Sequence, residues 1–304
     1  MLCRARSSGQ GDDSHTIHCR GYRKRRAPGR ATAGAGSLVL LGALVMALGI
    51  ALGCFEAVVE IGFGGTARAA APLIVDGDFE ANENGNQLRA REAGGQGWYE
   101  SRNRQGPEEA RLLLKLSTKS IGGNKTCKAM IKAHPEHNTY LSQCLAEPKS
   151  GRFSLQWDIY VREILPPYNR SAFQMIGNAR QRGRGPNGSG KERFVFLGFA
   201  AGTEPGKIDL FAFEGRNQDQ WDEQTILVRG LDLEAWHTIR VDVDVEHQSY
   251  QVSVVGVTDE PSEVQAFRTK KDDPPETLTH LSFASWDDGL GTFYVDNVIE
   301  PVGR

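Results

Sequence analysis

Cysteine is scarce in this sequence and unevenly distributed. Five cysteines occur among 304 residues, and three of them, Cys3, Cys19 and Cys54, precede residue 55. The chain has no Cys-x-x-Cys pair, the knuckle usual in zinc sites with two cysteine ligands. Although His134 and His137 lie between Cys127 and Cys144, we therefore do not expect a zinc site there. In an oxidising compartment this isolated pair is most simply a disulfide.

A surplus of positive charge is also absent from most of the chain. From Ala70 onward, 27 Lys and Arg stand against 34 Asp and Glu, a net charge of −7. Proteins that bind nucleic acid present a basic surface, so no nucleic-acid partner is expected. Residues 185–191 approach the pattern of a phosphate-binding loop, but Glu192 stands where that loop requires Ser or Thr. Nucleotide binding is therefore excluded as well.

Long apolar runs are missing except for one near the N-terminus. Residues 1–36 carry eight Lys and Arg against two Asp, which is typical of a basic, disordered leader. Residues 37–55 follow as an uncharged apolar run of about 19 residues, which fits a long signal-peptide core or a short membrane span. Because the basic residues precede this run, we expect the N-terminus inside and the remainder of the chain outside.

Three fates of residues 37–69 remain open. Ala67 and Ala69 form an Ala-x-Ala site, and cleavage of the signal peptide there would release a secreted product. Without cleavage, residues 37–55 would anchor the chain, which is the only membrane contact that we expect. The stretch ending at Cys54 resembles a lipobox, with Ala51 where that pattern usually has Leu. Each fate places residues 70–304 outside the cytoplasm.

The remaining sequence favours β-strands. In residues 152–163, Phe153, Leu155 and Trp157 alternate with polar neighbours, which predicts a long half-buried strand. Further apolar segments recur at short intervals with turn residues between them, and only residues 107–117 and 128–146 are compatible with helix. We therefore predict an all-β domain over residues 70–304, a two-sheet antiparallel β-sandwich of the jelly-roll type.

Several motifs in this region resemble known families. Residues 234–256 look like the Trp-His-x-Ile-x-Val hairpin of concanavalin-A-like domains of the laminin-G (LamG-like) and pentraxin kind. Residues 291–300 resemble the closing strand of such domains and of carbohydrate-binding modules. Residues 73–85 and 95–101 are similar to the opening of jelly-roll carbohydrate-binding modules. The resemblance implies a concanavalin-A-like sandwich with a carbohydrate-related role.

Asp242, Asp244 and Glu246 recur at every second position of the hairpin, so in a strand they would share one face. Laminarinase- and lichenase-type endoglucanases, which this sandwich resembles, carry such acids as nucleophile and proton donor. The first acid here is Asp instead of Glu, and Arg240 continues the same face. Mixed charge of this kind is typical of a solvated sheet face. The pattern therefore favours a solvent-exposed strand face over a set of catalytic carboxylates.

The resemblance also implies one structural Ca²⁺. In jelly-roll carbohydrate-binding modules an early Glu and a late Asp often hold this ion together with backbone carbonyls. The matching positions are Glu80 and Asp296, and Ca²⁺ prefers such oxygen ligands. The alternative is that these acids cap turns and strand edges.

Sugar-binding sandwiches stack aromatic rings on pyranose rings and add a few planar polar groups. The candidates for these roles are Trp98, Tyr99, Trp221 and Trp286, with Asn217, Asp287 and Asp288 as polar partners. Packing over the sandwich edge is the alternative for each tryptophan. We expect an exported, non-catalytic, lectin-like domain that binds a polysaccharide or glycan. The alternatives are a glycoside hydrolase or polysaccharide lyase, and a structural or adhesive surface protein.

Overall fold

The computed structural model describes the chain in nine stretches. They are residues 72–81, 88, 97–100, 114–134, 138–178, 193–213, 224–268, 274–286 and 289–301. All belong to the unit Thr66–Arg304. Three stretches discussed above lie outside the described residues: the predicted leader (1–36), the predicted export segment (37–69) and the near match to a phosphate-binding loop (185–192). Within the described residues, no helix is long and apolar enough to cross a membrane.

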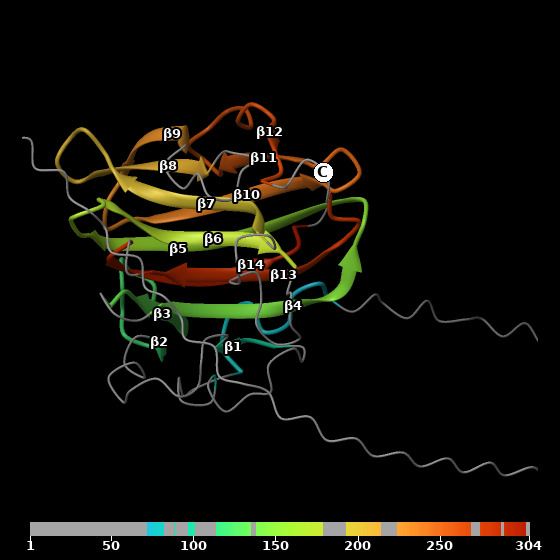
Figure 1. Cartoon of the computed structure of the whole chain (residues 1–304). Coiled ribbons are helices and arrows are strands. Elements are labelled where there is room, and N and C mark those ends of the chain that lie inside the picture. The colour runs from blue at the N-terminus through green and yellow to red at the C-terminus, as the bar shows by residue number, and fades with distance from the viewer. Residues whose placement is uncertain are drawn as a thin grey trace, which may run out of the picture. The chain divides into compact units, whose positions relative to one another are not determined.

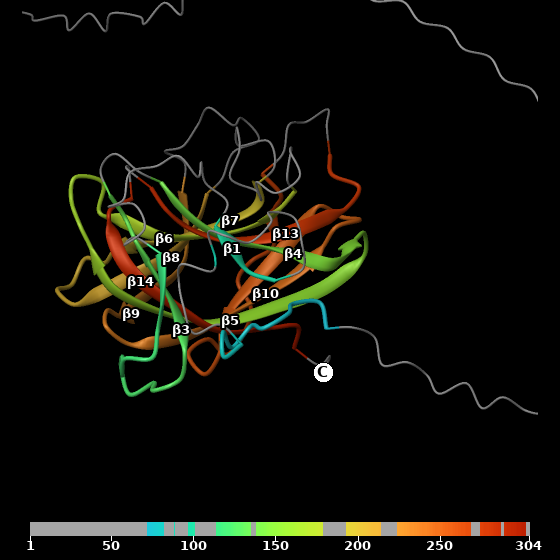
Figure 2. The ribbon, with the colours of Figure 1, turned by 90° about the horizontal axis from the view of Figure 1, so that it is seen from below.

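The described residues form a two-layer β-sandwich of two seven-stranded antiparallel sheets (Figure 1). Sheet A has the order β1 (Tyr99–Glu100), β4 (Thr139–Lys149), β13 (Leu278–Ser285), β6 (Arg170–Gly177), β7 (Arg193–Ala201), β8 (Lys207–Phe213) and β9 (Gln224–Asp232). Sheet B has the order β12 (Gln265–Ala266), β11 (Ser249–Val254), β10 (Trp236–Asp244), β5 (Arg152–Ile164), β14 (Gly291–Ile299), β3 (Lys128–Lys132) and β2 (Leu114–Ser117). Figure 2 shows β4 and β13 in one layer and β5 and β10 in the other. The predicted all-β fold, a sandwich of two antiparallel sheets, is confirmed.

The main core lies between the sheets and follows from period-two alternation. On β5, Phe153, Leu155 and Trp157 are buried in this core, while the polar residues between them face away from it. On β10, Val241 and Val243 are buried in the same core. The predicted faces of both strands are therefore confirmed, and the side chains between the buried positions form the outer face of sheet B.

Residues 107–117 and 128–146, which are compatible with helix, contain strands instead of helix where the structure describes them. Residues 114–117 are strand β2, and residues 128–132 and 139–146 belong to β3 and β4. β3 pairs with β2 on one side and with β14 on the other. These two ladders satisfy backbone groups that an isolated segment would have to pair within a helix. Long-range pairing therefore overrode the local pattern.

A second apolar cluster covers the outer face of sheet A. Its buried members are Tyr140, Phe173, Met175, Phe196, Phe211, Phe213, Ala284 and Trp286. They alternate along their strands with residues of the main core, so sheet A is buried on both faces over this area. This explains why β7 and β8 are apolar at successive positions, as expected for strands with two buried faces.

Candidate functional site

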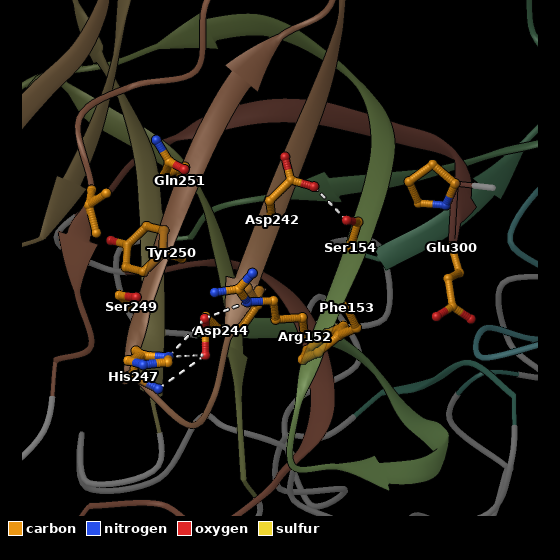
Figure 3. Close-up of a pocket in the computed structure, with 13 residues that line it drawn as sticks. Arg152, Phe153, Ser154, Asp242, Asp244, His247, Ser249, Tyr250, Gln251 and Glu300 are labelled. Carbon is orange, nitrogen blue, oxygen red and sulfur yellow. Dashed lines mark hydrogen bonds and ion pairs between the residues drawn. The ribbon is translucent and has the colours of Figure 1, made fainter. Parts of the chain in front are cut away.

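Asp242 and Asp244 lie side by side on the outer face of sheet B, as their spacing predicts (Figure 3). Asp242 is half-buried and accepts hydrogen bonds from Ser154 Oγ and from the Arg240 guanidinium, with Nη2 at 2.8 Å. Arg240 comes from the same strand two residues earlier, and Ser154 lies directly opposite Asp242 on β5. Both partners hold the Asp242 carboxylate in one orientation.

The carboxylate of Asp244 is also fixed by hydrogen bonds. Its carboxylate accepts from the backbone N–H and Nδ1 of His247, each at 3.0 Å, and from Arg152 Nε at 2.7 Å. The backbone hydrogen bond of His247 and the guanidinium of Arg152 lower the pKa of Asp244 to about 2. Asp244 is therefore ionised throughout the neutral range and does not supply a proton to a leaving group.

The predicted row of three acids ends after its second member. β10 stops at Asp244, and the chain turns over residues 245–248, so Glu246 is an exposed turn residue. The turn is closed by the Gln248 N–H, which donates to Val245 O at 3.2 Å. This corrects the expectation that all three carboxylates share one strand face.

The two aspartates lie in an open groove of about 660 Å³. Its lining residues are Arg152, Phe153, Ser154, Asp242, Val243, Asp244, His247, Ser249, Tyr250, Gln251, Val264, Glu300 and Pro301. The floor is built from the adjacent strands β5, β10 and β11. One flank is Val264, just before β12, and the other is Glu300 and Pro301, just after β14.

The pairing register arranges the polar floor in two rows. Arg152, Asp244 and Ser249 lie opposite one another on the three strands, and Ser154, Asp242 and Gln251 form the next row. Figure 3 shows Gln251, Asp242 and Ser154 across the groove, with Glu300 beyond β5. Neither Gln251 nor Arg152 is predicted as a site residue from the sequence. A paired β10–β11 hairpin would have placed Gln251 beside Asp242, whereas the contribution of β5 depends on long-range pairing.

Among the predicted ligand-binding aromatics, Trp98 is corrected by the structure. It is fully buried in the main core, where its ring lies 5.1 Å from that of Phe79 and 6.0 Å from that of Phe283. Its indole Nε1 donates to Asp76 O at 2.8 Å. No face of this ring is open to a sugar.

Tyr99 and Trp286 lie on the outer face of sheet A and are also buried. Trp286 packs on Phe173 with 4.5 Å between ring centroids, as part of the second apolar cluster. Its environment corresponds to the packing alternative. Asn217, Trp221, Asp287 and Asp288 lie outside the described residues.

The predicted calcium ligands Glu80 and Asp296 both hold protein donors. Glu80 Oε1 accepts from the Cys127 N–H at 2.6 Å, and Asp296 Oδ2 accepts from Asn124 Nδ2 at 2.7 Å. Asp296 is fully buried, and burial raises its pKa. No group of three or more His, Cys, Asp and Glu able to hold a metal ion occurs in the described part of the chain. The calcium site stays a prediction.

The buried ammonium of Lys128 lies in the same region. It donates to the carbonyls of Lys119, Thr126 and Ser117, at 2.9, 2.5 and 3.3 Å, and its charge interacts with those of Asp296 and Glu80. The three carbonyls use all three protons of the ammonium. The Lys128 ammonium thus interacts with the same two carboxylates that the calcium hypothesis requires.

The predicted disulfide between Cys127 and Cys144 is absent from the structure. Cys127 packs in the core between the sheets. Cys144 lies on β4 between Gln143 and the core residue Leu145, so it faces away from that core, with Sγ 3.1 Å from His280 Nε2. A disulfide requires Cβ atoms about 4 Å apart that point toward each other. Cys127 lies on the core side of sheet A and Cys144 points to the outer side, so their Cβ atoms do not point toward each other.

Comparison with known proteins concerns the fold alone. No family model matches the chain, and no curated protein matches it. A solved sialidase has a TM-score of 0.46 at 10% identity, over 75% of this chain and 18% of the sialidase. The catalytic domain of a glycoside hydrolase family 131 protein from Coprinopsis cinerea has a TM-score of 0.44 at 12% identity, over 77% of this chain and 96% of that domain. A carbohydrate-binding module from Bacillus subtilis has 0.36 at 10%, over 66% and 93%.

Proposed function

We propose that this domain binds a polysaccharide or glycan without catalysis, in the groove across β5, β10 and β11. The observation that carries the proposal is the two-row polar floor, in which Asp242 and Asp244 are held as oriented hydrogen-bond acceptors. Sugar hydroxyls are recognised by a few planar polar groups fixed in this way. Gln251 adds an amide to the same floor, and Val264, which is 65% exposed, adds apolar surface at the flank.

The state of the aspartates supports binding over hydrolysis. A retaining or inverting glycosidase needs one carboxyl group that carries a proton near neutral pH. The pKa of Asp244 is lowered to about 2, and Asp242 is ion-paired with Arg240. Asp244, which accepts a hydrogen bond from Arg152, therefore lacks the surroundings of a proton donor.

The charge of the groove points to a neutral glycan. Asp242, Asp244 and Glu300 contribute three carboxylates, whereas Arg152 is the only Lys or Arg among the described residues of the lining, and the nearby Arg240 is ion-paired with Asp242. Uronic acids or sulfated sugars would meet like charges there. We further propose that the domain lies outside the cytoplasm, either secreted or anchored. This part of the proposal rests on residues 37–69.

The test is native affinity electrophoresis of the exported chain through gels that contain neutral or acidic polysaccharides. We expect retardation by a neutral polysaccharide and a clear loss of it in the double variant Asp242→Asn, Gln251→Ala. Asp232→Asn, an exposed acid on sheet A paired with Lys207, is the matched control and should leave retardation unchanged. Circular dichroism of each variant verifies the fold.

Three other outcomes would contradict the proposal. Release of new chain ends from the retarding polysaccharide, lost in Asp244→Asn, would identify a hydrolase or lyase instead. Retardation that survives the double variant would remove the groove as the binding site. Absence of retardation by every polysaccharide would favour the structural or adhesive alternative.

A further inference from the structure

A thiol and an imidazole face each other on the outer face of sheet A, on the other sheet from the groove. Cys144 of β4 lies directly opposite His280 of β13 in the antiparallel register. Their neighbours Leu145 and Leu281 point into the main core, so Cys144 and His280 point away from it. The Sγ–Nε2 distance is 3.1 Å, within hydrogen-bonding range for sulfur.

The surrounding hydrogen bonds assign the protons of this pair. Asn178 Nδ2 donates to Thr277 O at 2.8 Å, which leaves its Oδ1 to accept from Thr279 Oγ1 at 3.1 Å. The single hydroxyl proton of Thr279 is used in that bond. The 2.7 Å contact between Thr279 Oγ1 and His280 Nδ1 is therefore an Nδ1–H donating to the hydroxyl oxygen. A neutral His280 then presents an unprotonated Nε2 to the Cys144 thiol.

The neutral form of His280 is the one favoured by its surroundings. The imidazole is 7% exposed, and its burial lowers the pKa to about 4. The side chain is therefore an imidazole at neutral pH and does not carry a permanent charge. Nucleophile, base and a third group that orients the base form the arrangement found where thiols are activated.

We propose that Cys144 is a nucleophilic thiol for small α,β-unsaturated carbonyl compounds, with His280 as the base and Thr279 as the residue that positions it. Sγ forms a bond to the β-carbon, and the π electron pair of the C=C bond moves to the α-carbon. The Sγ proton passes to His280 Nε2 and from there to the α-carbon. The sum is addition of S–H across the double bond, so nothing is oxidised and no group leaves.

His280 is a weak base, but its unprotonated Nε2 can take part in both halves of this step. A base that is unprotonated at neutral pH accepts the thiol proton as the S–C bond forms. An imidazolium in a desolvated site then returns that proton readily to the α-carbon, since burial disfavours its charge. Cys144 is half-buried, so part of this residue is exposed to solvent.

Cys127 is an internal reference for this reactivity. It is 3% exposed in the main core, and burial raises the pKa of its thiol, with the charge of Glu80 adding to the effect. A buried thiol with a raised pKa is poorly nucleophilic. The two cysteines thus offer opposite environments in one folded chain.

The test is labelling of the native full chain with N-ethylmaleimide, followed by mass spectrometry of the peptides that contain each cysteine. We expect Cys144 to react faster than Cys127. We expect His280→Ala to slow the Cys144 reaction by about tenfold, less than the ~100-fold of a typical positioned base because His280 is a weak one. Thr279→Val should cause a smaller decrease, since the imidazole stays but loses its orientation.

Chemical rescue separates a base from a packing residue. Imidazole added to the His280→Ala variant should restore part of the Cys144 rate, which a purely structural role of His280 would not produce. His237→Gln removes another buried histidine, whose Nε2 lies 2.8 Å from Asp232 O, and should leave the Cys144 rate unchanged. Equal rates in the wild type and His280→Ala, or labelling of Cys144 only after denaturation, would overturn the proposal.

Discussion

Lys128 and Asp296 are both fully buried, and their opposite charges interact. They lie where β3 and β14 meet the segment of residues 72–81, which we call the N-terminal segment. Burial lowers the pKa of the Lys128 ammonium, and the attraction of Asp296 partly opposes that shift. Three backbone carbonyls and the nearby charge of Glu80 complete the surroundings of the ammonium. This region thus contains a cation supplied by the chain itself.

Removal of this ammonium should destabilise the fold and expose the calcium question. We expect Lys128→Ala to cost about 3 kcal/mol, because the variant leaves a buried charge at Asp296 without its compensation. We also expect Ca²⁺ to raise the thermal midpoint of Lys128→Ala more than that of the wild type, since the vacated oxygens suit a hard cation. Thermal unfolding with and without Ca²⁺ measures both effects. A wild-type midpoint that Ca²⁺ does not raise would remove Glu80 and Asp296 as a native calcium site.

The contact between the N-terminal segment and β14 should not tolerate a methyl group at Gly77. The Val298 N–H donates to Gly77 O at 2.9 Å, and a Cβ on Gly77 would lie 1.8 Å from Val298 O. Gly77→Ala must therefore separate the two segments, at a cost of about 1–3 kcal/mol in urea unfolding. Gly151→Ala is the matched control, because a Cβ there meets nothing within 4 Å. Equal stability of both variants would mean that the contact is looser than described.

The buried imidazole of His280 should make the protein less stable below neutral pH. Its pKa is lowered from 6.5 to about 4 by burial, so between these pH values the unfolded chain binds the proton more readily than the folded chain. Stability is then lost as the pH falls from about 6.5 to about 4, by roughly 3 kcal/mol in total. His280→Gln should flatten this part of a pH series of urea denaturation curves. An unchanged slope in the variant would assign the effect to other groups.

The hydrogen bonds to Asp244 should contribute to stability in acid. With the pKa lowered from 3.8 to about 2, the unfolded carboxyl takes up its proton first, and the contribution of Asp244 is lost between these two pH values. Below this window Asp244→Asn and the wild type should therefore converge, whereas above it the variant should be less stable. Asp259→Asn, at an exposed position, is the matched control for the loss of one carboxylate. Denaturation curves at a series of acidic pH values measure the difference.

The sequence by itself determined the class of fold and the faces of strands such as β5 and β10. Val241 and Val243 point inward and Asp242 and Asp244 outward because a strand alternates its side chains, whatever its neighbours are. The same local rule predicted the inward face of β5. It failed at Glu246, where the chain turns, because the period of two ends with the strand.

Only the tertiary structure decided which of these faces meet. Arg152 and Gln251 lie beside Asp244 and Asp242 because of the order β5, β10, β11. Cys144 lies on the outer face of sheet A, whereas Cys127, which precedes β3 of sheet B, packs between the sheets. The burial of Trp98 depended likewise on packing against Phe79 and Phe283, which are distant in sequence or separated by a loop. Alternation is a property of neighbouring residues, whereas register and layer order arise from pairing between segments far apart in the chain. The groove and the Cys144–His280 pair therefore became visible only after folding.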